Sequence, residues 1–336
     1  MEMQLDVFTP PIASYIHHAN MLSIIDLECG NSSTFEPWFS HNFIQLQCPL
    51  DLSTNRESQL DFCHETFTSI YEDFLDIQRF HRTFIERYEG GLLTFLKDQL
   101  NEGYYVELVA NEYEMEPSIY YQKTHMDTNM LIFGYNLEKA YFLARFYTTD
   151  TYNTCEVSFE QMLQAFYGVQ HHYYWSKYAR LLKYDVNYSI PEFNMERFTI
   201  CLSNYLASTN PLHHDAAMVY GIRTYGKVME YYSALSRNQT AIDYRPVSVL
   251  YEHKKCLVRK ARFLHATMNV EIEPHILDSL QELEKAMVAI RNLTIKYSIS
   301  KDTRLLQKII DSLAECRDKE AATLEKLSNR LSLPLT

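Results

Sequence analysis

Two adjacent histidines, His17 and His18, stand in the stretch SYIHHANMLSII, near the start of a helix predicted over residues 15–27. Histidine titrates near neutral pH, so a histidine in this position can act as a general base toward an amine. The structural alternative is that one ring packs in the core while the other is solvated. The pair predicts acid–base chemistry at this helix, to be weighed against ordinary packing.

Two further histidine doublets occur, His171–His172 and His213–His214. A metal site would need several such ligands to converge with a carboxylate. Asp215 directly follows the second pair, but the chain has no HExxH string or other helix-spaced ligand set. We therefore expect no bound metal, and we interpret the aromatic block HHYYWSKY as packing between the two halves of the chain.

The string RPVSVLYEHKK contains Arg245, Glu252 and His253 on one predicted helix. Helical spacing places Glu252 on one face of that helix and His253 on another. A Glu–His pair can do acid–base work or bind substrate. An Arg–Glu pair can instead brace the helical domain against the first domain, and this second interpretation is favoured.

The seven cysteines are scattered and show no CxxC spacing, which is typical of reduced thiols rather than of a disulfide framework or a zinc cluster. Cys29, in LECGNSS after the first predicted helix, is a candidate displaced nucleophile. An incidental thiol is the favoured interpretation of this residue.

The elements that must position these groups change in character near residue 150. Before it, helical patterns over residues 15–27, 58–87 and 90–103 accompany strand patterns over residues 41–48, 104–110, 130–135 and 139–147. This order predicts an α+β layout, with helices packed on one face of an antiparallel sheet.

From residue 158 onward nearly every segment shows helical periodicity. The predicted helices cover residues 158–170, 193–207, 215–236, 245–268, 275–298 and 301–331. The leucine stripe of the last helix is interrupted by Arg317 and Glu320, which favours the outer helix of a bundle over a long coiled coil. We therefore predict a first domain over residues 1–157 and an all-helical domain over residues 158–336.

Composition restricts the classes of partner. The formal net charge of −12 gives a field that does not attract nucleic acid or an anionic membrane, and the basic stretch EHKKCLVRKAR is interpreted as a solvated helix face. No glycine-rich phosphate loop, signal peptide or apolar run of membrane-spanning length occurs. We expect a soluble, cytoplasmic protein that binds neither nucleic acid nor membrane.

One long stretch, THMDTNMLIFGYNLEKAYFLARFYTTDTYNTCEVSFEQMLQAFYGV, carries a family resemblance. An aliphatic strand ends in Gly-Tyr, a short charged turn and a second strand follow, and Ser-Phe-Glu opens a helix. In this order the stretch resembles proteins related to butirosin biosynthesis protein H, whose first domain is similar to papain-like and C39-peptidase-like folds. The strings LSNYLAST, YGIRTYGKVMEYY and DYRPVSVLYEHKKCLVRKARFL resemble the helical half of relatives from nonribosomal peptide and related gene clusters, so the likeness covers most of residues 10–268.

The resemblance implies acyl transfer from a thioester by a cysteine at the start of the first helix. A histidine on the Gly-Tyr strand would be its base, and an acidic group on the next strand would orient that histidine. In this chain the nucleophile position falls on His18 or His17, the base position on Thr128, and the acidic position on Arg145. His125, three residues before Thr128, would point to the opposite side of a regular strand.

The resemblance therefore implies a natural-product biosynthesis protein that acts on a carrier-protein-tethered acyl or peptidyl thioester without the family cysteine. His18 would be the general base, Arg145 would bind an anionic group such as a phosphopantetheine phosphate, and no separate cofactor is expected. The substrate would be a small-molecule amine or acyl group. One alternative is a catalytically dead accessory protein that binds a carrier protein or a peptide synthetase. Another is a structural protein that forms a homodimer through its C-terminal helices.

Overall fold

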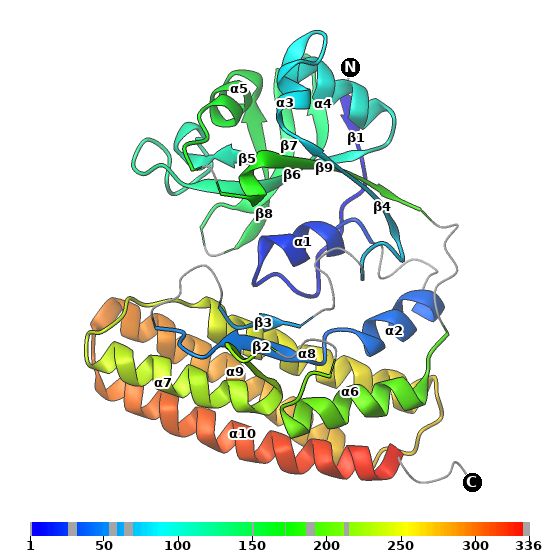
Figure 1. Ribbon diagram of the computed structural model, residues 1–336, viewed down its shortest axis with the longest axis vertical. Coiled ribbons are helices and arrows are strands. Elements are labelled where there is room, and N and C mark those ends of the chain that lie inside the picture. Colours follow the sequence, from blue (N-terminus) through cyan, green and yellow to red (C-terminus); the bar gives the residue numbers. More distant parts are fainter. Residues whose placement is uncertain are drawn as a thin grey trace. The chain divides into compact units, whose positions relative to one another are not determined.

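A computed structural model describes residues 2–25, 32–53, 59–63, 70–149, 151–171, 173–185, 192–211 and 215–331, with the backbone alone at 32–34. The chain divides into two compact units, each built from two separate segments (Figure 1). Unit 1 is Met1–Cys29 with Tyr71–Ser189, and unit 2 is Gly30–Ile70 with Ile190–Thr336. This division differs from the single boundary expected after residue 157, because the chain enters unit 2 early, leaves it at residue 70 and returns at residue 190.

Unit 1 contains an antiparallel sheet in which the strands lie in the order β4-β9-β5-β6-β7-β8. Strand β1 also pairs with β6. The predicted hairpin is confirmed, since β6 and β7 pair directly with a bulge between Ile132 and Gly134. The strands are β1 (Glu2–Gln4), β4 (Leu75–His81), β5 (Tyr105–Asn111), β6 (Asp127–Asn136), β7 (Tyr141–Tyr147), β8 (Tyr152–Ser158) and β9 (Tyr178–Tyr184).

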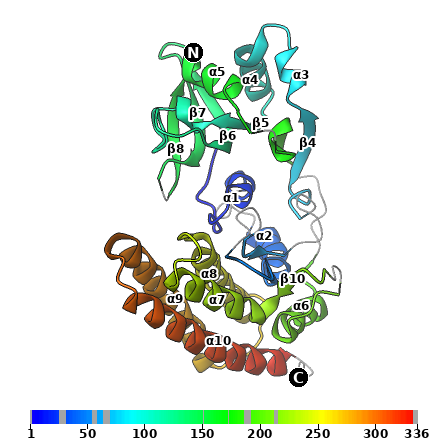
Figure 2. The ribbon, with the colours of Figure 1, turned by 60° about the vertical axis from the view of Figure 1, so that its left-hand side comes forward.

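Helices cover both faces of this sheet. The helices of unit 1 are α1 (Ile16–Leu22), α3 (Thr83–Glu86), α4 (Gly91–Asn101) and α5 (Phe159–Tyr167), with short 3-10 turns η1 (Glu112–Glu114) and η2 (Trp175–Lys177). The apolar core lies between the sheet and α4 and α5, where β5 contributes Val106 and Leu108, while α1 contacts β6 and β7 from the other side (Figure 2). Because side chains alternate along a strand, Glu107 of β5 points toward α1.

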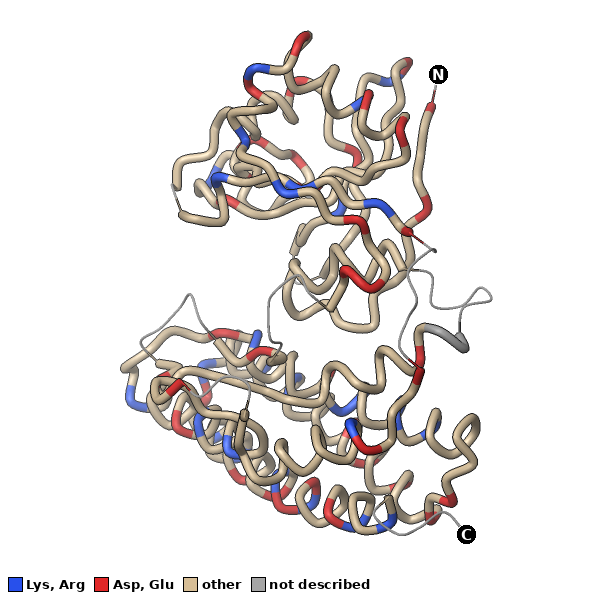
Figure 3. Tube along the Cα trace, turned by 45° about the vertical axis from the view of Figure 1, so that its right-hand side comes forward, with Lys and Arg blue, Asp and Glu red and all other residues tan. Residues whose placement is uncertain are grey.

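Unit 2 combines long helices with a small sheet in the order β10-β2-β3 (Figures 1 and 2). Charged residues of both signs are interspersed along its helices (Figure 3). The long helices predicted near residues 245–268, 275–298 and 301–331 are confirmed. The elements are α2 (Ser32–His41), β2 (Leu46–Pro49), β3 (Asp61–Phe62), α6 (Met195–Ala207), β10 (Met218–Tyr220), η3 (Gly221–Arg223), α7 (Thr224–Ser236), α8 (Arg245–Ala266), α9 (Pro274–Ser300) and α10 (Arg304–Leu331).

Several predictions of secondary structure were wrong, and the strand predicted from residue 41 is correct only from Leu46 onward, because His41 ends α2. Residues 58–87 form no long helix, because the described part of this range holds β3, β4 and the short α3. Ile77 and Phe80 are three residues apart, which fits a helical stripe, but β4 pairs with β9, a strand about 100 residues later in the chain. The part after residue 158 is also not all-helical, since it contributes β9 and β10.

None of the helices in the described ranges is both long and apolar enough to cross a membrane.

Candidate functional site

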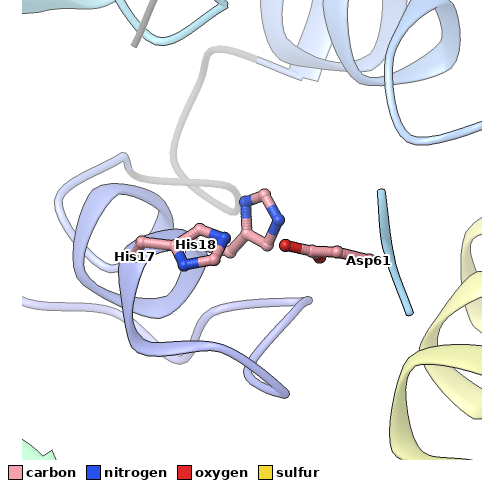
Figure 4. A group of neighbouring side chains, drawn as sticks. All are labelled: His17, His18 and Asp61. Atoms are coloured by element: carbon pink, nitrogen blue, oxygen red, sulfur yellow. The ribbon is translucent and has the colours of Figure 1, made fainter. Parts of the chain in front are cut away.

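The predicted catalytic histidines lie on α1, and Figure 4 shows both side chains. The His18 side chain is buried, and its Nδ1 lies 2.7 Å from the hydroxyl oxygen of Tyr71. His17 is half-buried, stacks on Tyr15 and contacts the His18 ring at a centroid distance of 4.2 Å. The first part of the helix therefore places two imidazoles side by side, with a tyrosine hydroxyl positioned to fix one of them.

A layer of polar side chains lies between α1 and the sheet of unit 1. The Asn20 amide donates to Glu107 at 3.0 Å and accepts from the Tyr152 hydroxyl at 2.7 Å. Arg180 of β9 forms an ion pair with Glu107, with 2.7 Å between Nε and Oε2. Asn20 and Glu107 are almost fully buried, and burial raises the pKa of the Tyr152 phenol. Their mutual contacts satisfy groups that would otherwise be costly to bury.

Arg145, the residue at the family's acidic position, is bound to its surroundings in unit 1. Its guanidinium donates to the backbone oxygen of Phe8 at 2.5 Å and to the hydroxyl of Thr154 at 3.1 Å. It also lies over the ring of Tyr152, and burial lowers its pKa. These contacts connect the N-terminal segment to β7 and β8.

The residues predicted at the base position lie around the end of β5 and the start of β6. Thr128 is opposite Ala110 in the β5–β6 pair. His125 precedes the strand, stacks on Tyr113 at 4.2 Å and accepts a 2.9 Å hydrogen bond from the Asn111 amide. The contacts described for His125 are thus with β5 and η1, whereas those described for His18 are with α1 and Tyr71.

The six cysteines within the described ranges are free thiols. Burial raises the pKa of all six, to about 12 for Cys48 and to about 11 for Cys63, Cys256 and Cys316. A raised pKa leaves little thiolate, which is the nucleophilic form of cysteine. Cys29, the candidate displaced nucleophile, lies outside the described residues.

The predicted site residues on α8 are Arg245, Glu252 and His253, and they contact other residues of unit 2. Arg245 forms an ion pair with Asp243, with 2.7 Å between Nη2 and Oδ2, and Glu252 is buried. His253 is fully buried, donates from Nε2 to the backbone oxygen of Ile44 at 2.8 Å, and has a pKa lowered well below 6.5 by desolvation. The described contacts of His253 are thus all with the core of unit 2, where the ring is not exposed.

Sequence reasoning missed a fully buried ionic cluster beside His253. The Glu320 carboxylate of α10 accepts hydrogen bonds from Lys254 at 2.5 Å, from Tyr205 at 2.8 Å and from Tyr225 at 2.6 Å. All four side chains are buried. The sequence did hold a signal for this cluster, because Glu320 interrupts the leucine stripe of the last helix. Glu107 interrupts the apolar strand YYVELVA in the same way.

Several rings of the aromatic block HHYYWSKY lie on the surface of unit 1. Tyr173, Tyr174 and Trp175 are 41%, 67% and 43% exposed, respectively, and His171 is exposed as well. His172 and the pair His213–His214 lie outside the described residues.

Two of the surface hollows formed by the described residues are in unit 2. One, of about 530 Å³, is lined by α6 and Leu331, and the other, of about 690 Å³, is lined by residues 50–53, α7 and Gln239. Neither hollow is lined by a predicted site residue.

No protein-family model matches the chain, and no curated protein matches it either.

Proposed function

We propose that the protein is an accessory member of a natural-product assembly system, which binds a carrier protein or a peptide synthetase without catalysing acyl transfer. The observation that carries this proposal is the state of the three positions at which the resemblance expects a triad. They hold His18, Thr128 and Arg145, and Arg145 is bound to Phe8 and Thr154 where an acidic partner of the base would be needed.

Two further features support an accessory role. The pKa values of the described cysteines are all raised by burial, so these thiols are poor replacements for the missing nucleophile. The layout of unit 1, with a first helix packed against an antiparallel sheet, is compatible with the papain-like domain that the resemblance implies. A carrier protein and its phosphopantetheine-bound acyl group are the ligands that such a domain would recognise.

A second candidate function is cysteine-independent acyl transfer with His18 as general base. The observation that favours it is the 2.7 Å contact between His18 Nδ1 and the Tyr71 hydroxyl. If the phenol oxygen accepts a hydrogen bond from Nδ1–H, the ring is held in the tautomer whose Nε2 can take a proton from an attacking amine.

Intact-mass spectrometry separates these functions. A carrier protein loaded with an acyl-phosphopantetheine thioester is incubated with this protein and a mixture of amines, beside His18→Ala and Cys29→Ser variants. Binding is followed in parallel by native mass spectrometry.

The accessory role predicts a complex in which the thioester persists at the rate seen without protein. Acyl loss that disappears in His18→Ala and survives in Cys29→Ser would instead establish a converted enzyme. Loss that requires Cys29 would show that the nucleophile has moved along the chain. Absence of any complex with loaded carriers would refute the accessory role.

A further inference from the structure

An exposed group of aromatic side chains surrounds η2 in unit 1. We name it the aromatic cluster, and its members are His171, Tyr173, Tyr174, Trp175 and Tyr178, together with Arg79 of the neighbouring strand β4.

Three of its rings, at alternate positions of the chain, stack in a ladder. His171 and Tyr173 stack with centroids 5.4 Å apart and planes 15° apart, and Tyr173 and Trp175 stack at 5.5 Å and 7°. Exposed rings in this number are unusual on a soluble surface unless they contact a partner, since tyrosine and tryptophan contribute most of the binding energy in many interfaces.

The ladder is held in place by buried polar groups. The Asp127 carboxylate, whose side chain is 1% exposed, accepts from the His171 backbone N–H at 2.6 Å and from His171 Nδ1 at 2.9 Å. The buried Ser176 hydroxyl donates to the backbone oxygens of His171 and Tyr173 at 2.8 and 2.9 Å. A surface that is ordered before binding loses less conformational entropy when a partner arrives.

Arg79 gives the cluster a positive centre. Its guanidinium carbon lies 3.8 Å from the centroid of the Tyr178 ring and 5.1 Å from that of Tyr174. A hydrogen bond with Arg79 lowers the pKa of the Tyr174 phenol. Arginine stacked on aromatic rings keeps donors available in its plane for a carboxylate.

The local charge is opposite to that of the whole chain. Arg79 and Lys177 are both exposed and carry positive charge at the cluster, whereas the sequence has a net charge of −12. The acidic groups that the described contacts bring near the cluster are Asp127, which is buried against His171, and Glu86, which pairs with Arg82. A negatively charged partner therefore meets cations here, although the protein as a whole would repel it.

We infer that the aromatic cluster is a docking site for an acidic peptide segment of a partner protein. Tyrosine, tryptophan and arginine are the residue types enriched at protein-binding hot spots. The net charge of −12 opposes both kinds of anion, but it opposes a nucleic acid, which carries a charge on every nucleotide, more than a short peptide whose acidic residues alternate with apolar ones. This inference does not rest on the proposed function, because it depends only on contacts within unit 1.

Fluorine NMR of protein labelled with 5-fluorotryptophan tests the docking site directly. The sequence has two tryptophans, and Trp38 is buried in unit 2, so its resonance is an internal control while that of Trp175 reports on the cluster. The probes are two 12-residue peptides with the same apolar residues, one with glutamates and the other with lysines at the remaining positions, and a thymidine 12-mer. The matched variants are Arg79→Ala in the cluster and Arg197→Ala, which removes an exposed arginine of α6.

The glutamate peptide is expected to shift the Trp175 resonance and leave that of Trp38 in place. Arg79→Ala should weaken its binding about tenfold or more, as for a hot-spot arginine, while Arg197→Ala should bind like the unmodified protein. The inference would be overturned if the Trp175 resonance did not move or if the lysine peptide bound as well as the glutamate peptide. It would also be overturned if the thymidine 12-mer bound more strongly than the glutamate peptide, or if the Arg79→Ala variant bound the glutamate peptide normally. The Trp38 resonance shows in every sample that unit 2 remains folded, and far-UV circular dichroism does so for the whole chain.

Discussion

The Glu320 carboxylate is the acceptor for three buried donors in unit 2, namely Lys254, Tyr205 and Tyr225. Desolvation lowers the pKa of Lys254, and the nearby Glu320 carboxylate opposes that shift. The carboxylate thus keeps a buried ammonium charged inside a helical core, where an unpaired charge would be strongly unfavourable.

Glu320→Gln is therefore expected to lower the free energy of unfolding by about 3–5 kcal/mol, because it leaves the Lys254 charge without its counter-ion. Urea denaturation followed by circular dichroism measures the change. Glu282→Gln removes one partner of the exposed ion pair with Lys319 and should leave the midpoint unchanged. Similar midpoints for both variants would mean that Lys254 is neutral in the folded protein.

A second residue-scale prediction concerns pH. Burial raises the pKa of Glu112 to about 7, although the 2.5 Å hydrogen bond from Ser118 opposes this shift. Because the folded state binds this proton more tightly than the unfolded state, the stability that Glu112 contributes is present below about pH 4.5 and is lost as pH rises through 7.

Glu112→Gln should accordingly gain stability relative to the unmodified protein at pH 8, by up to about 3 kcal/mol, and gain little or nothing at pH 4. Denaturation curves of both proteins at the two pH values give the difference. A gain that is the same at pH 4 and pH 8 would show that the ionisation of Glu112 is not the cause.

At the scale of elements, the junction between α6 and α7 depends on one glycine. Gly221 opens η3 with a φ of 59°, and a Cβ added there would lie 2.1 Å from the backbone oxygen of Tyr205. Gly226, five residues later in α7, has no atom within 4 Å of the corresponding position. The two glycines thus form a matched pair in the same unit.

Gly221→Ala should destabilise the protein by about 2 kcal/mol or more, since both the left-handed backbone and the contact with Tyr205 become unfavourable. Gly226→Ala should stabilise it by about 0.5–1 kcal/mol, because alanine is the better helix former. Thermal unfolding of the two variants measures these changes. Equal shifts would imply that η3 rearranges without cost.

The helices and strands also differ in whether local sequence patterns could predict them. The helices α8, α9 and α10 and the β6–β7 hairpin follow local periodicity, so they were predictable. The strands β4 and β9 pair across about 100 residues, and α2 carries Pro37 inside it, so local patterns gave no reliable signal for them. Likewise, His18 and Arg145 could be located from a motif, whereas the partners Tyr71 and Phe8 that define their surroundings come from distant parts of the chain.

At the scale of the whole molecule, unit 2 needs both of its segments. Lys260 of α8 donates to the backbone oxygen of Phe39, and His253 donates to that of Ile44, while β2 lies between β10 and β3. Phe39, Ile44 and Leu46 are also buried core residues. The early segment therefore supplies acceptors and apolar surface that the helices of the later segment require.

A fragment containing only residues 190–336 is expected to be helical but loosely packed, with retained far-UV circular dichroism, strong binding of an apolar dye and a broad thermal transition. Adding a peptide of residues 30–70 should suppress dye binding and sharpen the transition. A fragment that unfolds cooperatively by itself would show that the early segment is dispensable.

The split of unit 2 has a consequence for the order of events during synthesis. Residues 30–70 leave the ribosome before the rest of unit 2, and about 120 residues of unit 1 follow before residue 190 appears. At about 5–20 residues per second, this segment waits about 6–24 s before the first residue of the later segment appears, and longer for the helices that bury Trp38, Phe39 and Leu46. During that interval a nascent chain carries an unpartnered aromatic stretch beside a growing sheet, so the yield of correctly folded protein depends on the speed of translation and on the holding chaperones of the host.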